Sequence, residues 1–191
     1  MEHSEDTPEQ RTLVRAARAG DPAAFERIVA IYGARILSYC HRMCGAAAED
    51  LAQGVFVKLY LAIGQFDPDR PLSPFLFRIA HNHCLDAIRK RRIPTVPLHP
   101  VEGMPDPLSK VADPVPTPAA LAERAEILDA VDRALMSLPA PYRSVLVLRH
   151  VEGLSYEAIS EALGLPMATI KIRIHRGREK LQQILRPFVS K

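Results

Sequence analysis

Residues 155–178 read SYEAISEALGLPMATIKIRIHRGR, and this stretch decides the fold class. Ser155 is a helix-capping residue, and a helix is predicted from Tyr156 to Leu163. Gly164 can adopt the left-handed conformation that a tight turn needs, and a strongly basic helix follows from about Met167 to Leu185. Two helices joined by a short glycine turn, the second of them basic, predict a helix-turn-helix.

The last predicted helix has two different faces at 100° per residue. Its buried stripe is formed by Ile170, Ile174, Gly177 and Leu181. A groove-binding helix places a central strip against base edges and cations against phosphates. The predicted DNA-contacting residues are Ala168, Thr169, Lys171, Ile172, Arg173, His175 and Arg176. Ile172 could contact thymine methyl groups, and the alternative is a partner contact or an isolated exposed apolar residue.

Composition excludes several classes of protein. The chain has 191 residues, of which 48% are hydrophobic and 25% charged, so mostly disordered and collagen-like chains are excluded. No apolar run approaches the roughly 20 residues of a membrane span, so direct membrane insertion is not expected. Residues 1–6 are acidic with no apolar core behind them, and a secretory signal is not expected. Three cysteines form no disulfide framework, and we expect a cytoplasmic protein.

Positive charge is concentrated at two places. Residues 169–191 carry seven Lys and Arg against one Glu, a net charge of +6. A second basic cluster is formed by Arg89, Lys90, Arg91 and Arg92. Two basic clusters indicate a polyanion that is contacted at two sites. The alternative is a pair of solvated helix ends, because cations also favour helix C-termini.

Proline divides the chain. Eight of the 17 prolines lie in residues 93–118, a density that no helix tolerates, and this segment carries a net charge of −2. We therefore predict an all-α protein with two small, independently folding helical domains, residues 1–92 and 119–191, joined by a long proline-rich linker. The other helices are predicted near Glu9–Arg18, from Asp21-Pro22 to Gly45, Ala48–Ile63, from Ser73 to the basic cluster, Ala119–Met136 and Pro141–Val151.

Two sets of motifs resemble one known family. The second half contains Leu138-Pro139-Ala140-Pro141-Tyr142-Arg143, then Glu152-Gly153-Leu154-Ser155-Tyr156-Glu157, then Thr169-Ile170-Lys171-Ile172-Arg173. The first half contains Ala48-Glu49-Asp50-Leu51-Ala52-Gln53 and Phe77-Arg78-Ile79-Ala80-His81-Asn82. Together they are similar to the extracytoplasmic-function sigma factors of bacterial RNA polymerase, over nearly the whole chain outside the N-terminal tail and the linker.

The resemblance implies a function for each segment. The polymerase-binding residues would be Glu49, Asp50, Gln53 and Phe56, docked on the clamp helices of the largest subunit. The residues for the downstream promoter element, bound as single-stranded DNA, would be Phe75, Arg78, His81, Asn82, Arg89, Lys90, Arg91 and Arg92. The second domain would bind the flap of the other large subunit and read the upstream element as duplex, and the linker would thread toward the RNA exit path. An anti-sigma factor is also implied, which would hold the chain inactive until a stress signal.

The residues themselves fit these functions only in part. Single strands are bound by cations, stacking rings and base-edge contacts, and loop 67–72 could form the wall of a pocket for a flipped base. Without the resemblance, Asn82 is read as a helix residue that bonds locally. Phe75 replaces the usual tryptophan of the family and is read first as a core residue. Gly54 replaces a usual glutamate, and Ile172 replaces a common serine, which suggests an unusual upstream element.

Other functions are less well supported. No phosphate-binding glycine loop, paired carboxylates or nucleophile motif indicates an enzyme, and no cofactor is expected. Cys40, His41 and Cys44 could form a metal or redox site, with His81, His83 and Cys84 as further candidates, but the usual zinc spacings are missing and cysteine often packs in cores. The main alternative is a stand-alone helix-turn-helix transcriptional regulator, which would need a separate sigma factor.

Overall fold

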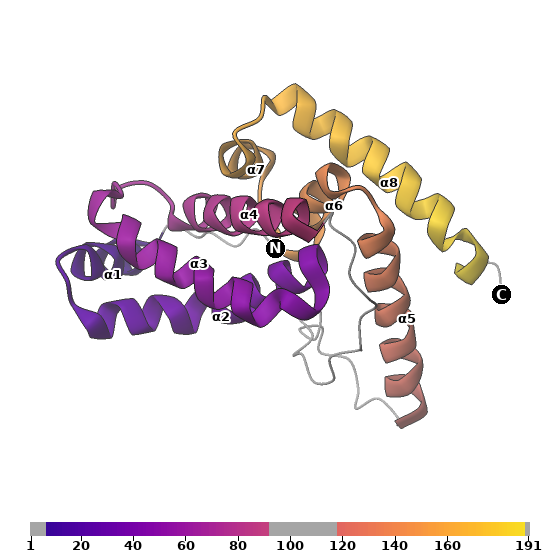
Figure 1. Cartoon of the computed structure of the whole chain (residues 1–191), viewed down its shortest axis with the longest axis horizontal. Helices are drawn as coiled ribbons and strands as arrows, with labels where there is room; N and C mark the ends of the chain where they lie inside the picture. Colours follow the sequence, from indigo (N-terminus) through magenta and orange to yellow (C-terminus); the bar gives the residue numbers. More distant parts are fainter. Residues whose placement is uncertain (1–6, 92–117, 190–191) are drawn as a thin grey trace.

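The computed structural model describes residues 7–91 and 118–189, which we call the first and second halves, and every element within them is helical. The first half contains α1 (Pro8–Arg18), α2 (Pro22–Cys44), η1 (Gly45–Ala47), α3 (Ala48–Ala62), η2 (Ile63–Gln65) and α4 (Leu72–Arg91). The second half contains α5 (Pro118–Ser137), α6 (Ala140–Leu146), η3 (Val147–Val151), α7 (Tyr156–Leu163) and α8 (Met167–Val189). The prediction of an all-α chain is confirmed for these residues (Figure 1).

Local capping chemistry sets the helix boundaries. The side chain of Asp21 accepts hydrogen bonds from the backbone N–H groups of Ala23 and Ala24 and so begins α2. Ser155 caps α7 in the same way, and Gly164 ends it with a φ of 63° in the left-handed region. These three predictions are confirmed. The predicted linker, residues 93–118, lies outside the described residues except for Pro118, which is the first residue of α5.

The core of the first half lies among α2, α3 and α4. Tyr32, Ile36 and Tyr39 of α2 belong to the same buried cluster as Leu59 of α3 and Phe77 of α4. Because these positions recur at helical spacing, each helix turns one apolar stripe inward and one polar face to solvent. Helix α1 packs against α2, at the end of the bundle that holds the turn between α3 and α4 (Figure 1).

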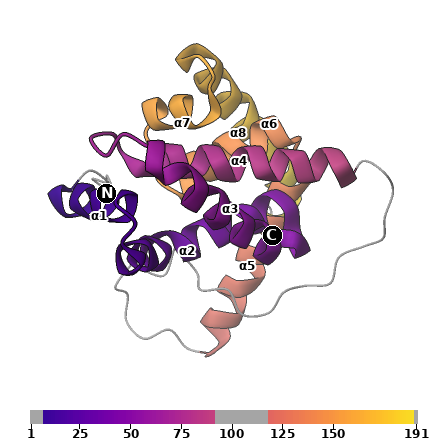
Figure 2. The same ribbon diagram turned by 60° about the vertical axis from the view of Figure 1, so that its left-hand side comes forward.

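The two halves pack against each other. Helix α7 packs against α4 (Figure 2), and α5 and α6 contact α2. Arg143 of α6 connects the halves, because its Nη1 donates to the carbonyl oxygen of Met43 at 2.6 Å while its Nη2 donates to those of Met136 and Leu138. Buried side chains of both halves form one continuous cluster. Independent folding of two domains stays a prediction.

The segment after α6 differs from the predicted single helix Pro141–Val151. Helix α6 ends at Leu146, and η3 continues it as a wider, π-helical turn in which the N–H of Glu152 donates to the carbonyl oxygen of Val147 at 3.0 Å. The wider turn buries Val147 and Leu148 and places the carboxylate of Glu152 in contact with Arg35 of α2. Long-range packing therefore decides the form of this turn.

Candidate nucleic-acid interface

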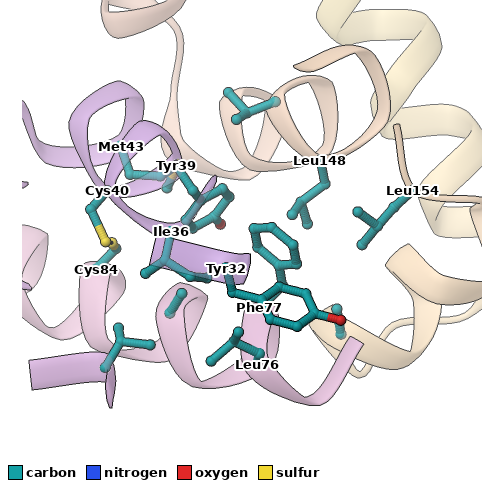
Figure 3. Close-up of a cluster of buried hydrophobic side chains, with 14 of the residues drawn as sticks. Tyr32, Ile36, Tyr39, Cys40, Met43, Leu76, Phe77, Cys84, Leu148 and Leu154 are labelled. Atoms are coloured by element: carbon teal, nitrogen blue, oxygen red, sulfur yellow. The ribbon is translucent and has the colours of Figure 1, made fainter. Parts of the chain in front are cut away.

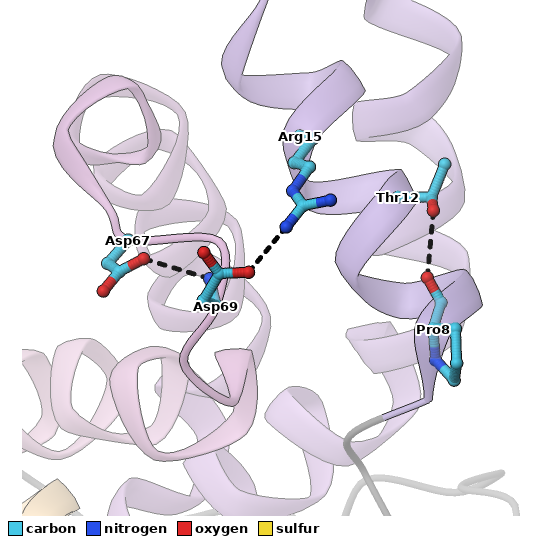
Figure 4. A network of polar contacts seen from close by, with 5 residues as sticks. All are labelled: Pro8, Thr12, Arg15, Asp67 and Asp69. Atoms are coloured by element: carbon cyan, nitrogen blue, oxygen red, sulfur yellow. Dashed lines mark hydrogen bonds and ion pairs between the residues drawn. The ribbon is translucent and has the colours of Figure 1, made fainter.

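The loop between η2 and α4, residues 66–71, is held by α1. Nη2 of Arg15 lies 2.6 Å from Oδ1 of Asp69 (Figure 4), and Nε of Arg18 donates to the carbonyl oxygen of Gly64 at 3.0 Å. Within the loop, the N–H of Asp69 donates to Oδ1 of Asp67 at 3.0 Å, which is an Asx turn. These contacts fix the loop beside the start of α4.

A hollow of about 470 Å³ lies between this loop, the end of α3, the start of α4 and α7. Its apolar walls come from Leu61, Phe66 and Phe75, and its polar walls include Gln65, Asp67, Arg70, Arg78 and Glu161. Phe75 is half-buried, with its ring centroid 4.7 Å from that of Phe66 and the guanidinium carbon of Arg78 5.1 Å away. An aromatic wall edged by a guanidinium suits a nucleic-acid base.

One exposed face of α4 carries three of the predicted single-strand contacts. Arg78, Asn82 and Arg89 are exposed, and at 100° per residue they lie within about 40° of one another. Lys90 is exposed next to them, the side chain of Arg91 is not described, and Arg92 lies outside the described residues. This face combines two cations with one amide that can contact a base edge.

His81 does not lie on that face. Its side chain is only 8% exposed, and its Nδ1 lies 3.0 Å from the hydroxyl oxygen of Tyr39. Burial and the nearby charge of Arg173 lower the pKa of His81 to about 4, so the ring is neutral at pH 7 and shares a hydrogen bond with the hydroxyl of Tyr39. The burial of His81 could be predicted from the sequence, because Phe77, His81 and Cys84 have the spacing of a buried helical stripe.

Helix α8 has the two predicted faces. Ile170 and Ile174 are buried, and Gly177 lies so close to α6 that an added Cβ would be 3.2 Å from the side chain of Leu146. On the opposite side the exposed predicted residues are Ala168, Lys171, Ile172, His175 and Arg176. Thr169 and Arg173 are half-buried. The predicted buried stripe is confirmed for Ile170, Ile174 and Gly177, while Leu181 is half-buried. The outer face is open except near Arg173.

Helix α3 presents a third surface. Glu49, Asp50 and Gln53 are exposed, Phe56 is half-buried, and the core side of the helix is formed by residues such as Leu51 and Val55. The sequence reasoning missed the apolar continuation of this face by Val57, Tyr60 and Leu61, which are 55%, 63% and 77% exposed. The sequence indicates this apolar continuation through the spacing of these residues from Gln53, because positions 53, 57, 60 and 61 share a helical face. Exposed apolar residues clustered beside carboxylates and an amide are typical of a protein-binding surface.

The glycine at position 54 has a structural explanation. An added Cβ would lie 2.6 Å from Nε2 of His83 in α4, so glycine permits the imidazole to pack directly on α3. Nζ of Lys58 lies 2.8 Å from Nδ1 of the same ring. Burial and then Lys58 lower the pKa of His83, so the neutral ring accepts a hydrogen bond from the ammonium group. The longer side chain of the usual glutamate would need this histidine to move.

The cysteines pack in the core. Cys40, Cys44 and Cys84 are all buried, and the sulfurs of Cys40 and Cys84 are 3.8 Å apart. Hydrogen bonds to Cys40 and Cys44, and then burial, raise the pKa of the Cys84 thiol, which keeps it protonated and unreactive. Within the described ranges, no group of three or more His, Cys, Asp or Glu side chains could hold a metal ion. The same ranges contain no helix with the length and apolar character needed to cross a membrane.

Comparison with known proteins matches both halves to one family. Residues 28–93 match the family model "Sigma-70 region 2", and residues 128–181 match "Sigma-70, region 4". The ECF RNA polymerase sigma factor SigW of Bacillus subtilis is 38% identical over 91% of this chain and 95% of its own length. The RNA polymerase sigma-H factor of Pseudomonas aeruginosa is 33% identical over 96% of this chain and 97% of its own length.

Solved structures have the same architecture. CnrH, determined in complex with the cytosolic domain of CnrY, has a TM-score of 0.69 and 28% identity over 93% of this chain and 97% of its own. The sigma factor RpoE of Bartonella quintana, determined with the anti-sigma factor NepR, has a TM-score of 0.64 and 24% identity over 85% of this chain and 96% of its own. With region 2 matching the half that contains α3 and α4, and region 4 matching the half that contains α8, the chain belongs to the extracytoplasmic-function (ECF) sigma factors of RNA polymerase.

Proposed function

We propose that three helices carry the interactions through which this sigma factor directs core RNA polymerase to specific promoters. Helix α3 binds the clamp helices of the largest polymerase subunit. The exposed face of α4 and the hollow beside it bind the downstream promoter element as single-stranded DNA. Helix α8 binds the upstream element as duplex in the major groove. In this function the chain acts without catalysis of its own and works in the cytoplasm, where the polymerase is.

The observation that supports this proposal best is the coexistence of two chemically different nucleic-acid surfaces in one chain. The hollow beside Phe75 combines an aromatic wall with guanidinium groups, which suits an unstacked base. The outer face of α8 instead offers a continuous exposed strip around Ile172 and Arg176, which suits base edges in a duplex groove. A protein that opens a promoter must contact both forms of DNA.

The polymerase contacts are supported by two apolar surfaces. One is the face of α3 that contains Asp50, Gln53 and the exposed Tyr60 and Leu61. The other is a hollow of about 1000 Å³ between α5, η3 and α8, with apolar walls that include Leu135 and Leu181. We assign the first to the clamp helices and the second to the flap of the other large subunit, because each offers apolar area to a partner helix.

Control by an anti-sigma factor belongs to the same proposal. It rests on the family resemblance, and CnrH offers a parallel, since its structure was determined in complex with the cytosolic domain of another protein. We propose that such a partner covers the DNA-binding or polymerase-binding surfaces until a stress signal releases the chain.

Reconstitution with purified core polymerase tests the function. We expect the chain and core enzyme together to initiate transcription at specific sites within a library of genomic fragments, with no other sigma factor present. A stand-alone regulator would bind duplex DNA in the same assay but give no specific transcript until a second sigma factor is added. That result would replace the proposal with the alternative.

A further inference from the structure

Two arginines of α1 contact the chain around the loop between η2 and α4. Arg15 and Arg18 are one helical turn apart, so they share a face of α1. Arg18 donates to the carbonyl oxygen of Gly64, just before the loop, and Arg15 pairs with Asp69 within it. The walls of the hollow beside Phe75 include neither Gly64 nor Asp69. Helix α1 therefore holds this segment without touching the residues that would contact a bound base.

The residues that α1 contacts lie next to residues that line the hollow. Gln65, a lining residue, directly follows Gly64. Asp67 and Arg70, which also line it, lie on either side of Asp69 in the chain. The backbone N–H of Asp69 donates to Oδ1 of Asp67 at 3.0 Å (Figure 4), and the N–H of Arg70 donates to the carbonyl oxygen of Asp67 at 3.1 Å. A displacement of Asp69 therefore moves the polar wall of the hollow with it.

The elements on both sides of this loop are fixed by the core. Val14 and Ala17 bury one side of α1 in the core cluster, and Phe77 does the same for α4 (Figure 3). Phe66 and Leu72 are buried at the two ends of the loop. Between these two anchors the chain depends on its own turn contacts and on α1 for its orientation.

The contribution of the ion pair is one of orientation. The side chains of Arg15 and Asp69 are 58% and 64% exposed, and exposed ion pairs add little to folding stability. The selectivity of a binding site, in contrast, is sensitive to displacements of about 1 Å in its polar groups. Loss of this pair should therefore change recognition at the hollow much more than it changes stability.

Asp67 links these contacts to a bound base. A carboxylate accepts hydrogen bonds and donates none, so it favours a base that presents an amino group over thymine, which has no amino group. Because Oδ1 is held by the backbone of Asp69, the direction of the carboxylate depends on where Asp69 lies. Arg15 can accordingly affect base recognition through two intervening contacts.

We propose that Arg15 is a positioning residue for base recognition: through Asp69 it orients Asp67 in the hollow and so sets the preference for one base of the downstream element. Arg18 supports the same wall through Gly64. This inference rests on the proposed function, because that function places an unstacked base in the hollow. It gives α1, a helix with no residue assigned to DNA or polymerase, a part in promoter choice.

Transcription by the reconstituted holoenzyme tests the proposal, on a promoter from the genomic library with its downstream element randomised. For Arg15→Ala we expect templates with the preferred base at one position to lose about fivefold in transcript yield, while templates with other bases there stay within about twofold. Preference should be kept at the other positions. The thermal denaturation midpoint of the free chain should be nearly unchanged, because the ion pair is exposed.

Asp69→Ala separates positioning from a direct contact of Arg15 with DNA. This variant removes the same ion pair but keeps the cation, and Asp69 does not line the hollow. A positioning function predicts the same loss of preference at the same position. A phosphate contact of Arg15 predicts instead that Asp69→Ala keeps or strengthens transcription with its preference intact. The double variant R15D/D69R reverses the pair and should restore the original preference.

Two further comparisons control for charge and for pathway. Arg27→Ala removes an exposed arginine of α2, gives the same change in charge and should leave base preference unchanged. In a chain that already carries Asp67→Ala, adding Arg15→Ala should have no further effect at the affected position, because Arg15 acts through Asp67. Independent, additive effects of the two substitutions would contradict that pathway.

The outcomes distinguish this inference from the proposed function. Equal losses on all templates together with a lower denaturation midpoint would make Arg15 a structural residue and overturn the inference. Unchanged preference in Arg15→Ala, or the same loss in Arg27→Ala, would overturn it as well. A preference for thymine at the affected position would contradict the assignment to Asp67. If the unmodified chain gives no specific transcript with core polymerase, the proposed function fails and the inference fails with it.

Discussion

Single residues on α8 differ in what they can recognise in DNA. Arg176 lies on the exposed outer strip, where a planar guanidinium can bind a guanine edge with two hydrogen bonds. Lys171 is exposed at the border of the strip, where an ammonium group suits a phosphate. Charge alone would make these positions equivalent, and geometry makes them different.

We predict that Arg176→Ala costs on the order of 1–3 kcal/mol of binding free energy and relaxes preference at one base pair of the upstream element. Lys171→Ala should weaken binding to all sequences and lower the salt slope by about one unit. The measurement is binding of the holoenzyme to promoters with a randomised upstream box at several salt concentrations. Ile172→Ser, which should change discrimination at a thymine without altering the salt slope, is the uncharged comparison. Equal, sequence-independent losses for the two cations would contradict the assignment.

The buried His81 makes the stability of the fold depend on pH. Its pKa of about 4 lies below the value near 6.5 expected for the unfolded chain, so the unfolded state binds more protons between these values. The resulting contribution is present above about pH 6.5 and is lost as pH falls toward 4, with an upper limit of about 3 kcal/mol.

His81→Gln keeps a hydrogen-bonding group near the hydroxyl of Tyr39 and removes the titration. We therefore expect the free energy of unfolding of the unmodified chain to fall more between pH 7 and pH 4.5 than that of the variant, measured by urea denaturation. His175→Gln removes an exposed histidine of α8 and serves as the control. Parallel curves for the unmodified chain and the His81 variant would show that this histidine does not stay neutral in the folded state.

At the scale of elements, the sequence predicted most helix boundaries to within a few residues. Asp21-Pro22, Ser155 and Gly164 act through local backbone contacts, and local contacts can be read from neighbouring residues. The hydrogen-bond partner of His81 and the π-helical turn η3 were not predicted, because both depend on residues that are distant in sequence. Tyr39 supplies the partner of His81 from another helix, and α2 supplies the arginine that Glu152 meets.

The two faces of α3 give a prediction for that element. The double change of Asp50 and Gln53 to alanine should weaken binding to core polymerase while leaving helicity and thermal stability nearly unchanged, because both side chains are exposed. Leu51→Ala, on the buried side of the same helix, should instead cost about 2–4 kcal/mol of folding stability. Affinity for immobilised core enzyme and thermal denaturation separate the two effects. A large loss of stability in the double variant with normal polymerase binding would reverse the assignment.

At the scale of the whole molecule, the division of the chain stays a prediction from the sequence, and the packing of the parts could not be predicted from it. Prolines are visible in the sequence, so a linker over residues 93–118 could be predicted, and almost all of it lies outside the described residues. The contacts of Arg143 with Met43 and of Arg35 with Glu152 join residues about 100 positions apart, and no local pattern indicates them.

Limited proteolysis tests this organisation. We expect cleavage first within residues 94–118, because that stretch is rich in proline and poor in aromatics, with two resistant fragments left. The structure adds that the two fragments should elute together at low salt, since ion pairs and a shared apolar cluster join them. Mass spectrometry of the products and size-exclusion chromatography at two salt concentrations provide the measurements. First cuts elsewhere would contradict the linker, and separate elution at low salt would contradict the packing of the halves.

The π-helical turn η3 has a consequence for how the gene can change. The N–H of Glu152 bonds to the carbonyl oxygen of Val147, five residues earlier, so the turn holds one residue more than an α-helical turn. Loss of one codon among residues 149–151 would leave the same two groups four residues apart, as in an ordinary α-helix, and would keep Glu152 near Arg35. Such an in-frame deletion would therefore cost the packing of the two halves less than it costs the hollow assigned to the flap, which His150 and Val151 of this turn help to line.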